Sequence, residues 1–270
     1  MQGKDLSEQE AERKAYVGID VCESWLDVHV LPVGVAFRVA NSAHGHRQVK
    51  RRLKMWNVEL IVIEATGKWH RALHRSVHAS GYAAAVVNPL RARLFAEAIG
   101  ALAKTDRLDA RMLALFAASL TPSARPPAPV AVETLKELVQ ARESAVAEAT
   151  ALKNQRASAE TAFLRCHLTA RSARLAEDLA ALEAEIARCV KADESFARRS
   201  AILTSIPGIG PVVASTLLAR LSELGDCDDK QIAMLVGLAP LADDSGQRQG
   251  ARVIRGGRAA VRRVIYLAAL

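Results

Sequence analysis

Four carboxylates have residue types and spacing that could support chemistry. Asp20 ends one short apolar run, and Glu64 ends another. Asp106 and Asp109 lie three residues apart, a spacing that places both on one face of a helix. Gathered carboxylates raise each other's pKa values unless a cation neutralises them. Because Mg²⁺ prefers oxygen ligands and can hold the oxygens of a phosphodiester during its cleavage, the four acids predict a Mg²⁺ site that acts on nucleic acid.

Each of these acids also has a purely structural interpretation. Asp20 fits a turn at the end of a strand, and Glu64 and Asp106 each fit a helix cap. Asp109 fits an ion pair with a neighbouring cation on a solvated helix face. Taken singly, the structural interpretation of each acid is favoured over catalysis. Two further acids near the first strand are not separated from Asp20 by sequence alone: Glu23 and Asp27.

The segments that must position these acids alternate between strands and helices. Short β-like runs at 16–20, 25–31 and 35–39 favour an antiparallel meander. A basic helix, a buried strand, a second helix, a fifth strand and a third helix follow at 44–56, 60–64, 69–79, 83–88 and from Pro89. This order predicts an α/β domain with helices packed on a sheet, and it resembles the ribonuclease H-like (RuvC-like) fold.

The rest of the chain has a different composition. Residues 121–129 are rich in proline and mark a boundary. From 130 to 199, apolar residues recur at helical spacing, which favours a coiled-coil hairpin or pairing with a second protomer, or else a plain helical connector. We expect a polar, mobile leader at 1–14, an acidic domain at 15–120, the linker at 121–129, a helical coiled coil at 130–199, and a mostly helical final domain at 200–270.

The charge of the chain favours an anionic partner. The formal net charge is +8 and the pI is about 9.6, and nucleic acid is the commonest partner of such proteins. The four cysteines form no close pair, so neither a zinc knuckle nor a disulfide framework is expected. No run suggests a signal peptide or a membrane span, and we expect a cytoplasmic protein.

Two basic features and a glycine-rich turn offer places for phosphate. The segment Ser200–Ala214 resembles a helix-hairpin-helix motif, in which the amides of Gly208 and Gly210 could approach a backbone phosphate. A helical turn without a ligand is the alternative. The cluster at 47–54 could contact nucleic acid or merely solvate its helix. Further arginines form a basic run near the end of the chain, which favours a phosphate-binding strip, with a solvated face as the alternative. The run comprises Arg248, Arg252, Arg255, Arg258, Arg262 and Arg263.

Ser245 lies in the loop sequence Asp243–Gly246. Considered alone, a serine in such a loop is a turn residue. No histidine that could act as its base is nearby in the sequence. A nucleophilic role therefore depends on activation by a metal ion or by neighbouring arginines.

Several motifs together resemble a known family, the insertion-sequence-110 transposases, also called DEDD transposases or bridge-RNA-guided recombinases. Their order and spacing carry the resemblance, which covers most of residues 15–270. The motifs are Val17–Val21, Leu26–Val28, Ile63–Gly67, Val86–Pro89, Ala103–Arg111, Ile206–Pro211, Gly237–Pro240 and Asp244–Gly246.

The resemblance implies a junction-resolvase-like first domain whose Mg²⁺-binding tetrad is Asp20, Glu64, Asp106 and Asp109. It implies that Ser245 is a nucleophile that links covalently to DNA. It also implies donor and target DNA, a structured guide RNA and a homo-oligomer formed through the coiled coil, a dimer or tetramer. Contacts to nucleic acid are expected from Lys104, Arg107, Gly208, Gly210, Arg248, Arg252, Arg255 and Arg258.

Two departures from the family pattern leave other functions open. Cys22–Ser24 replaces the usual Ser-Lys after the first aspartate, and the chain stops at Leu270, where relatives usually continue with basic helices. We therefore expect a truncated chain. One alternative is a junction nuclease that uses water instead of Ser245. The other is an inactive nucleic-acid-binding regulator that pairs with a full-length relative.

Overall fold

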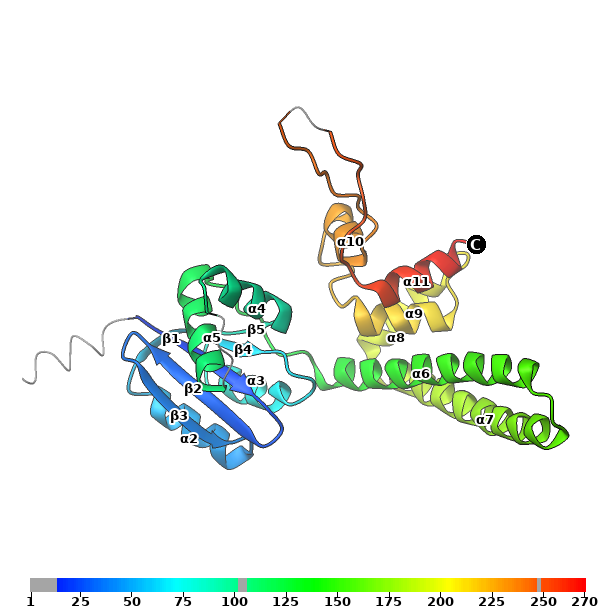
Figure 1. The fold of residues 1–270 in the computed structure, drawn as a ribbon, viewed down its shortest axis with the longest axis horizontal. Helices are drawn as coiled ribbons and strands as arrows, with labels where there is room; N and C mark the ends of the chain where they lie inside the picture. The colour runs from blue at the N-terminus through cyan, green and yellow to red at the C-terminus, as the bar shows by residue number, and fades with distance from the viewer. Residues whose placement is uncertain (1–13, 102–105, 247–248) are drawn as a thin grey trace, which may run out of the picture. The chain divides into compact units, whose positions relative to one another are not determined.

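The computed structural model describes residues 14–101, 106–246 and 249–270, with no side chains for 106–108. The chain divides into two compact units, Met1–Pro127 and Ala128–Leu270. The division falls within the proline-rich segment. Each unit is described by itself below, and the element labels are those of Figure 1.

A five-stranded mixed sheet forms the centre of the N-terminal unit. Its strands are β1 (Lys14–Val21), β2 (Trp25–Leu31), β3 (Val35–Ala40), β4 (Asn57–Glu64) and β5 (Ala84–Val87), in the order β3-β2-β1-β4-β5. β1, β2 and β3 form the antiparallel meander expected from their alternating residues, and β4 and β5 run parallel to β1. This is the sheet of a ribonuclease H-like domain, so the expected fold of this part is confirmed.

Helices cover both faces of the sheet (Figure 1). On one face, α2 (Ala43–Leu53) and α3 (His70–His78) pack through residues such as Val49 and Leu73. On the other face, α4 (Pro89–Ala98) and α5 (Asp106–Leu120) pack through residues such as Phe116. Ser42 caps α2 by accepting a hydrogen bond from the Gly45 amide. The unit is therefore a three-layer sandwich in which the sheet separates the two helix layers.

Alternation along β1 assigns each side chain to one of these layers. Val17 and Ile19 lie in the core beneath α2 and α3, whereas Tyr16 packs into the core beneath α4 and α5. Successive strand side chains point to opposite faces. Gly18 and Asp20 therefore face α5.

Two long helices form a hairpin at the start of the C-terminal unit. They are α6 (Val130–Ser158) and α7 (Ala162–Ala192). Ion pairs join Arg142 to Glu183 at 2.6 Å and Glu148 to Arg171 at 3.3 Å. The residue numbers increase along α6 while those of their partners decrease along α7. The helices are thus antiparallel, and the helical character expected here is confirmed. Pairing with another protomer stays a prediction.

Four shorter helices complete this unit: α8 (Glu194–Thr204), α9 (Pro211–Arg220), α10 (Asp229–Val236) and α11 (Ala259–Ala268). They share a core with the start of α6, where Leu135 and Val139 are buried. Asp228 and Gln231 form a reciprocal capping box at the start of α10, and Gly237 ends that helix in the left-handed conformation. None of the helices in the described parts of the chain is both long and apolar enough to cross a membrane.

Candidate active site

The first two predicted acids lie on adjacent strands. β1 and β4 are parallel, with Ile19 opposite Ile63. The next residues, Asp20 and Glu64, therefore occupy neighbouring positions at the carboxyl ends of the two strands. Since Ile19 and Ile63 point into the core beneath α2 and α3, the residue that follows each of them points to the α5 face. The sheet thus places these acids side by side on one surface.

Gly18 brings α5 directly onto that surface. A β-carbon at Gly18 would lie 2.1 Å from the Ala110 carbonyl oxygen and 2.3 Å from the Ala114 nitrogen. The missing side chain therefore lets the helix backbone touch the strand, and the next residue toward the start of α5 is the half-buried Asp109. Asp106 is the first residue of α5, but its side chain lies outside the described residues.

No complete metal site is formed by the described side chains alone. Among them, no group of three His, Cys, Asp or Glu residues is placed to hold an ion. Three predicted acids have described side chains, and each has at least one hydrogen bond, ion pair or electrostatic interaction: Asp20, Glu64 and Asp109. The strand register places Asp20 and Glu64 on the α5 face of the sheet, and the Gly18 contact holds the start of α5, with Asp109, against that face. The convergence of all four carboxylates stays a prediction.

Of the two further acids, Asp27 has a structural partner. Its side chain is 8% exposed and lies opposite Arg38 on β3. The Arg38 guanidinium donates to both carboxylate oxygens, at 2.9 Å and 2.7 Å, which is the geometry of a bidentate ion pair. Asp27 is therefore a neutralised element of the sheet rather than an open metal ligand, although it lies opposite Asp20. Glu23 is exposed beyond the end of β1.

Asn41 ties together the loops that follow the two acidic strands. Its side-chain amide donates to the carbonyl of Cys22 at 2.8 Å and to the carbonyl of Trp69 at 3.2 Å. Its oxygen lies 2.9 Å from Nε2 of the buried His46. Cys22 follows β1 and Trp69 precedes α3, so one side chain fixes both loops next to Asp20 and Glu64.

His29 faces the same layer as Asp20 because it lies opposite Gly18 in the sheet. Burial, and secondarily the positive charge of Arg111 on α5, lower the pKa of the His29 imidazole. The lowered pKa favours the neutral imidazole. Arg111, on α5, is a cation close to this ring.

In the C-terminal unit, α8, a glycine turn and α9 form a hairpin at the segment expected to bind phosphate. Gly210 caps α9, and a β-carbon there would meet open space. Gly208 has a φ of 87°, and a β-carbon there would lie 2.3 Å from the Ala268 carbonyl oxygen. The space beside the Gly208 α-carbon is thus filled by α11, whereas Gly210 is open to a ligand.

Ser245 lies on a long loop between α10 and α11 (Figure 1). The loop closes on itself through an antiparallel bridge between Leu241 and Val253. Ser245 is exposed, and within the described residues no hydrogen bond of its hydroxyl group is found. The described part of this loop therefore shows no base hydrogen-bonded to the serine.

The predicted basic run divides into an exposed part and a structural part. Arg252 and Arg255 are largely exposed and form loose ion pairs with Asp244 and Asp243 at 3.7 Å and 3.5 Å. Arg258 instead turns inward and binds Glu223 through two hydrogen bonds of 2.6 Å. Its guanidinium is thus held by Glu223 in this structure, and the expected contact of Arg258 with nucleic acid stays a prediction. Three predicted contacts lie outside the described side chains: Lys104, Arg107 and Arg248.

The Arg258 ion pair belongs to a network that holds the C-terminal helices together. Arg258 also donates to the carbonyl of Arg220 at 2.7 Å, and the Arg220 side chain binds Glu143 on α6 at 2.5 Å. The hydrogen bonds from Arg258 are the main reason that the pKa of Glu223 falls from its ordinary 4.5 to about 2. The network therefore requires an ionised Glu223.

Two glycines meet where the Ser245 loop leaves the helices. A β-carbon on Gly257 would lie 2.4 Å from the Gly237 α-carbon. Arg262 donates to the carbonyls of Gly237 and Gly256 at 3.2 Å and 3.0 Å. Both ends of the loop are thus fixed to one point of the helical scaffold, and we call this point the loop foot.

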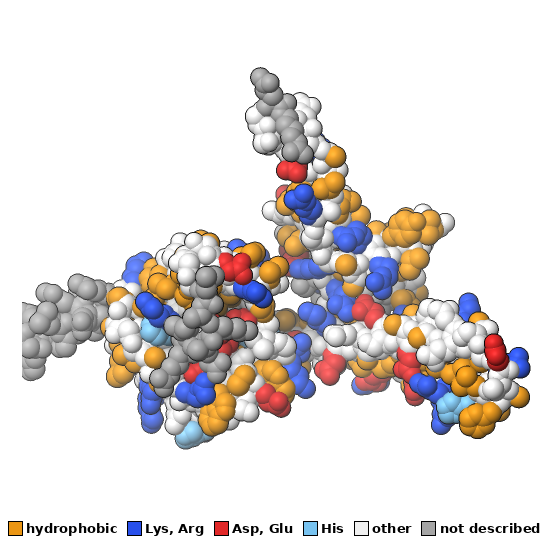
Figure 2. Space-filling view, in the orientation of Figure 1, with side chains coloured by type: hydrophobic (Ala, Val, Ile, Leu, Met, Phe, Trp, Pro, Cys, Tyr) orange, Lys and Arg blue, Asp and Glu red, His pale blue; other side chains and the backbone are white. Residues whose placement is uncertain are grey.

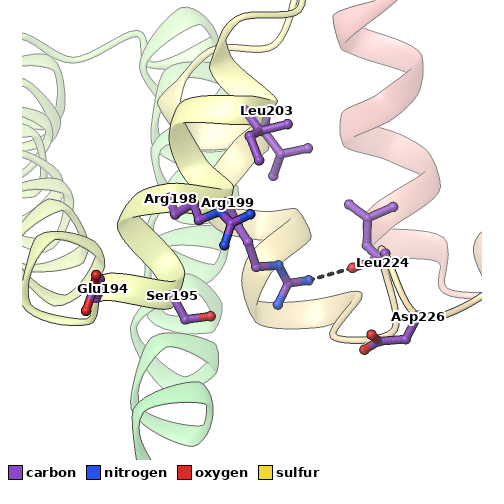
Figure 3. Close-up of a pocket in the computed structure, with 9 residues that line it drawn as sticks. Glu194, Ser195, Arg198, Arg199, Leu203, Leu224 and Asp226 are labelled. Atoms are coloured by element: carbon purple, nitrogen blue, oxygen red, sulfur yellow. Dashed lines mark hydrogen bonds between the residues drawn. The ribbon is translucent and has the colours of Figure 1, made fainter.

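A separate recess of about 690 Å³ lies between α8 and the turn after α9 (Figure 3). Arg199 donates across it to the Leu224 carbonyl at 2.9 Å. Its lining combines cations with acids, including Arg198 and Asp226. None of the predicted site residues lines this recess, so it is not part of the candidate active site.

Several residues that support the site were not predicted from the sequence. Gly18 carried a usable signal, because a glycine inside a strand often marks a close backbone approach. Asn41 carried none, since its partners lie 19 and 28 residues away along the chain. The inward direction of Arg258 was also not readable, because neighbouring arginines in the run look alike in sequence.

Comparison with known proteins identifies the family. A model of DEDD transposases of the IS110 type matches residues 17–159, and a model of the IS116/IS110/IS902 transposase family matches residues 200–270. The pilin gene-inverting proteins of Moraxella bovis and Moraxella lacunata are each 24% identical over 243 residues, covering 86% of this chain and 74% of the relative.

Among solved structures, RuvC of T. thermophilus in complex with a Holliday junction substrate is similar to 42% of this chain, over 99% of its own length, with 15% identity and a TM-score of 0.33. The first family match alone spans more than half of the sequence, and the second covers the C-terminal residues 200–270. The chain therefore belongs to the IS110 family of transposases, enzymes that act on DNA.

Proposed function

We propose that this transposase cuts and rejoins DNA with an acidic tetrad, Asp20, Glu64, Asp106 and Asp109, and with Ser245 as its nucleophile. The observation that carries the proposal is the β1–β4 register, which puts Asp20 and Glu64 side by side on the face covered by α5. The start of α5, which holds the other two acids, is brought to that face at Gly18.

The donor set fits a hard divalent cation, and Mg²⁺ is the one we propose. Carboxylate oxygens are the ligands such ions prefer. Asp20, Glu64 and Asp109, with Asp106, would hold it. When bound, Mg²⁺ would offset the charge of the carboxylates and of the scissile phosphate.

In the proposed reaction, the Ser245 Oγ bonds to phosphorus while the bond from phosphorus to one deoxyribose oxygen breaks. The serine proton leaves, and the released sugar oxygen gains a proton, so a phosphoserine diester and a free hydroxyl result. Attack by another DNA hydroxyl reverses these steps and releases the serine. The covalent link thereby conserves a phosphodiester for rejoining.

The exposed position of Ser245 and the lack of a base in the described part of its loop support a composite site. The serine then meets the acidic cluster only when a further contact brings the two together. We propose that a second protomer provides this contact through the α6–α7 hairpin, whose end exposes 80% of Phe163. A structured RNA that pairs with donor and target DNA is proposed to choose the sequences.

A covalent-trapping assay tests this function. The full chain is incubated with Mg²⁺, the RNA of the element and labelled junction DNA, and a protein–DNA band is sought on a denaturing gel. We expect a band that is absent in Ser245→Ala and Asp20→Asn. Ser195→Ala is the matched control, because Ser195 is also exposed in the C-terminal unit and lies in the recess instead.

The other outcomes separate the alternatives. Cut DNA without a covalent band in the parent chain would overturn the serine mechanism in favour of a water-using nuclease. Cleavage that survives in Asp20→Asn would remove the acidic tetrad from the mechanism. A chain that binds but does not cut, while a longer version forms the band, would be a regulator.

A further inference from the structure

The helix layer opposite the acidic site has an unusual charge distribution. From Val28 to Val58, the sequence carries six Lys and Arg residues and no Asp or Glu. α2 lies inside this stretch and α3 lies inside a second acid-free stretch, from Ala65 to Ala96. Figure 2 shows Lys and Arg side chains at the margin of the N-terminal unit where Figure 1 draws α2.

A straight row of basic side chains runs along the solvent side of α2 and onto Lys54, the residue that caps its end. His44, Arg47, Arg51 and Lys54 are exposed and follow one another at intervals of three, four and three residues, which aligns them on one helix face. At 1.5 Å per residue, the row is about 15 Å long. We call these four residues the α2 row.

The α2 row is not explained by contacts inside the protein. Among the residues that the structure describes, no ion pair to Arg47, Arg51 or Lys54 is found. Arg52, beside the row, has a different role, since its guanidinium lies over the Phe37 ring at 4.4 Å. The other face of α2 is anchored by the buried Val49 and Leu53. The helix therefore presents a fixed and unneutralised positive row to solvent.

Both the length and the chemistry of the α2 row fit a nucleic-acid duplex. Along about 15 Å of B-form DNA, one strand presents roughly four phosphates. Surfaces that bind single strands add aromatic rings on which bases stack. Beside the α2 row, by contrast, Phe37 lies under Arg52, and both Phe37 and Trp56 pack against the core. These rings are engaged within the protein, which favours a duplex over a single strand.

The position of the α2 row excludes the strand that is being cut. Asp20 and Glu64 face α5, whereas α2 covers the opposite face of the sheet. The sheet and its cores separate the two surfaces. A segment held on the α2 row must therefore be a different part of the DNA from the phosphate at the acidic cluster.

We propose that the α2 row is a second DNA-binding surface, which holds the phosphate backbone of a duplex arm of the recombining DNA. DNA is chosen over RNA because the family membership of the chain makes DNA its substrate. The row contacts phosphates and not base edges, so its role is to grip and orient any sequence.

The test is the salt dependence of binding by the full chain, measured by fluorescence anisotropy without divalent cations so that no strand is cut. The triple variant Arg47→Gln, Arg51→Gln, Lys54→Gln should lower the slope of log affinity against log salt by about 3, because each lost phosphate contact removes about 1. The parent should also bind junctions with long duplex arms more tightly than junctions with short arms, and the variant should lose that preference.

A matched control carries the same change in net charge elsewhere. Lys191, Arg198 and Lys230 are exposed in the C-terminal unit away from the end of the α6–α7 hairpin, and their triple glutamine variant should keep both the slope and the preference for long arms. An unchanged slope in the α2 variant, or an equal loss in the control, overturns the proposal. A loss seen with duplex RNA but not with duplex DNA also overturns it and assigns the row to RNA. Because these readouts need no catalysis, they are independent of the serine and tetrad assignments.

Discussion

The carbonyl oxygen of Ala110 lies against Gly18, only 2.1 Å from where a β-carbon on that glycine would be. A contact of this kind involves two backbones, so neither side can relieve a clash by changing a rotamer. It fixes the first turns of α5, and with them Asp109, against the strand that carries Asp20. The proposed assembly of the acidic cluster therefore depends on a residue with no side chain.

Replacing Gly18 with alanine should separate α5 from the sheet. We expect a loss of at least about 1–3 kcal/mol in the free energy of unfolding, as for other overpacked sites, together with loss of DNA cleavage. Urea unfolding and the trapping assay measure the two effects. Gly34→Ala is the control, because its β-carbon would meet open space and only its positive φ of 72° is unfavourable. Equal effects of the two substitutions would contradict this account.

Asp20 and Asp27 face each other across β1 and β2 and should respond oppositely to amidation. Asp27→Asn loses its charge-assisted hydrogen bonds to Arg38, so we expect destabilisation by about 1–3 kcal/mol. Asp20→Asn should abolish cleavage while the variant stays folded. Thermal unfolding and cleavage assays on both variants separate a structural acid from a catalytic one. Cleavage by Asp20→Asn at the parental rate would be the contrary result.

Asn41 should act as a positioning residue. Asn41→Ala removes the bonds to the loops after β1 and before α3, and displacing reacting groups by about 1 Å can cost roughly a hundredfold in rate. We expect a large fall in the cleavage rate with little change in the salt slope of DNA binding. Asn57→Ala, at the exposed start of β4, is the matched control. A parallel loss of rate and binding in Asn41→Ala would indicate general unfolding instead.

Acid should weaken the C-terminal unit through Glu223. Its folded pKa of about 2 lies below its ordinary 4.5, so the ion pair with Arg258 stabilises the fold above about pH 4.5. This contribution is lost as the pH falls toward 2. The parent should therefore lose stability more steeply over this range than Glu223→Gln, in denaturant titrations at stepped pH. Parallel pH profiles for the two proteins would show that the pair has no such role.

Much of the N-terminal fold follows from local sequence. Alternating residues at 25–31 and the apolar run at 60–64 fell on β2 and β4, and their order predicted the sheet. The pairing register was not predictable, because it depends on which strands meet and not on either strand alone. That register is what makes Asp20 and Glu64 neighbours.

The roles of the individual arginines in the basic run near Ser245 could not be predicted from the sequence. Arg255 and Arg258 are three residues apart and chemically identical, yet one is exposed and the other binds Glu223, 35 residues earlier. Only the tertiary fold distinguishes them. The same holds for Asp27, whose role is decided by Arg38 on the neighbouring strand.

The loop foot has a consequence for how this protein can vary over evolution. Because Gly237 and Gly257 meet, the two ends of the loop between them are held together by the helices. For such a loop, each doubling of length costs only about 0.6 kcal/mol in closure entropy. Under the proposed serine mechanism, insertions in this one loop would change the reach of the nucleophile without disturbing the helices that support the fold.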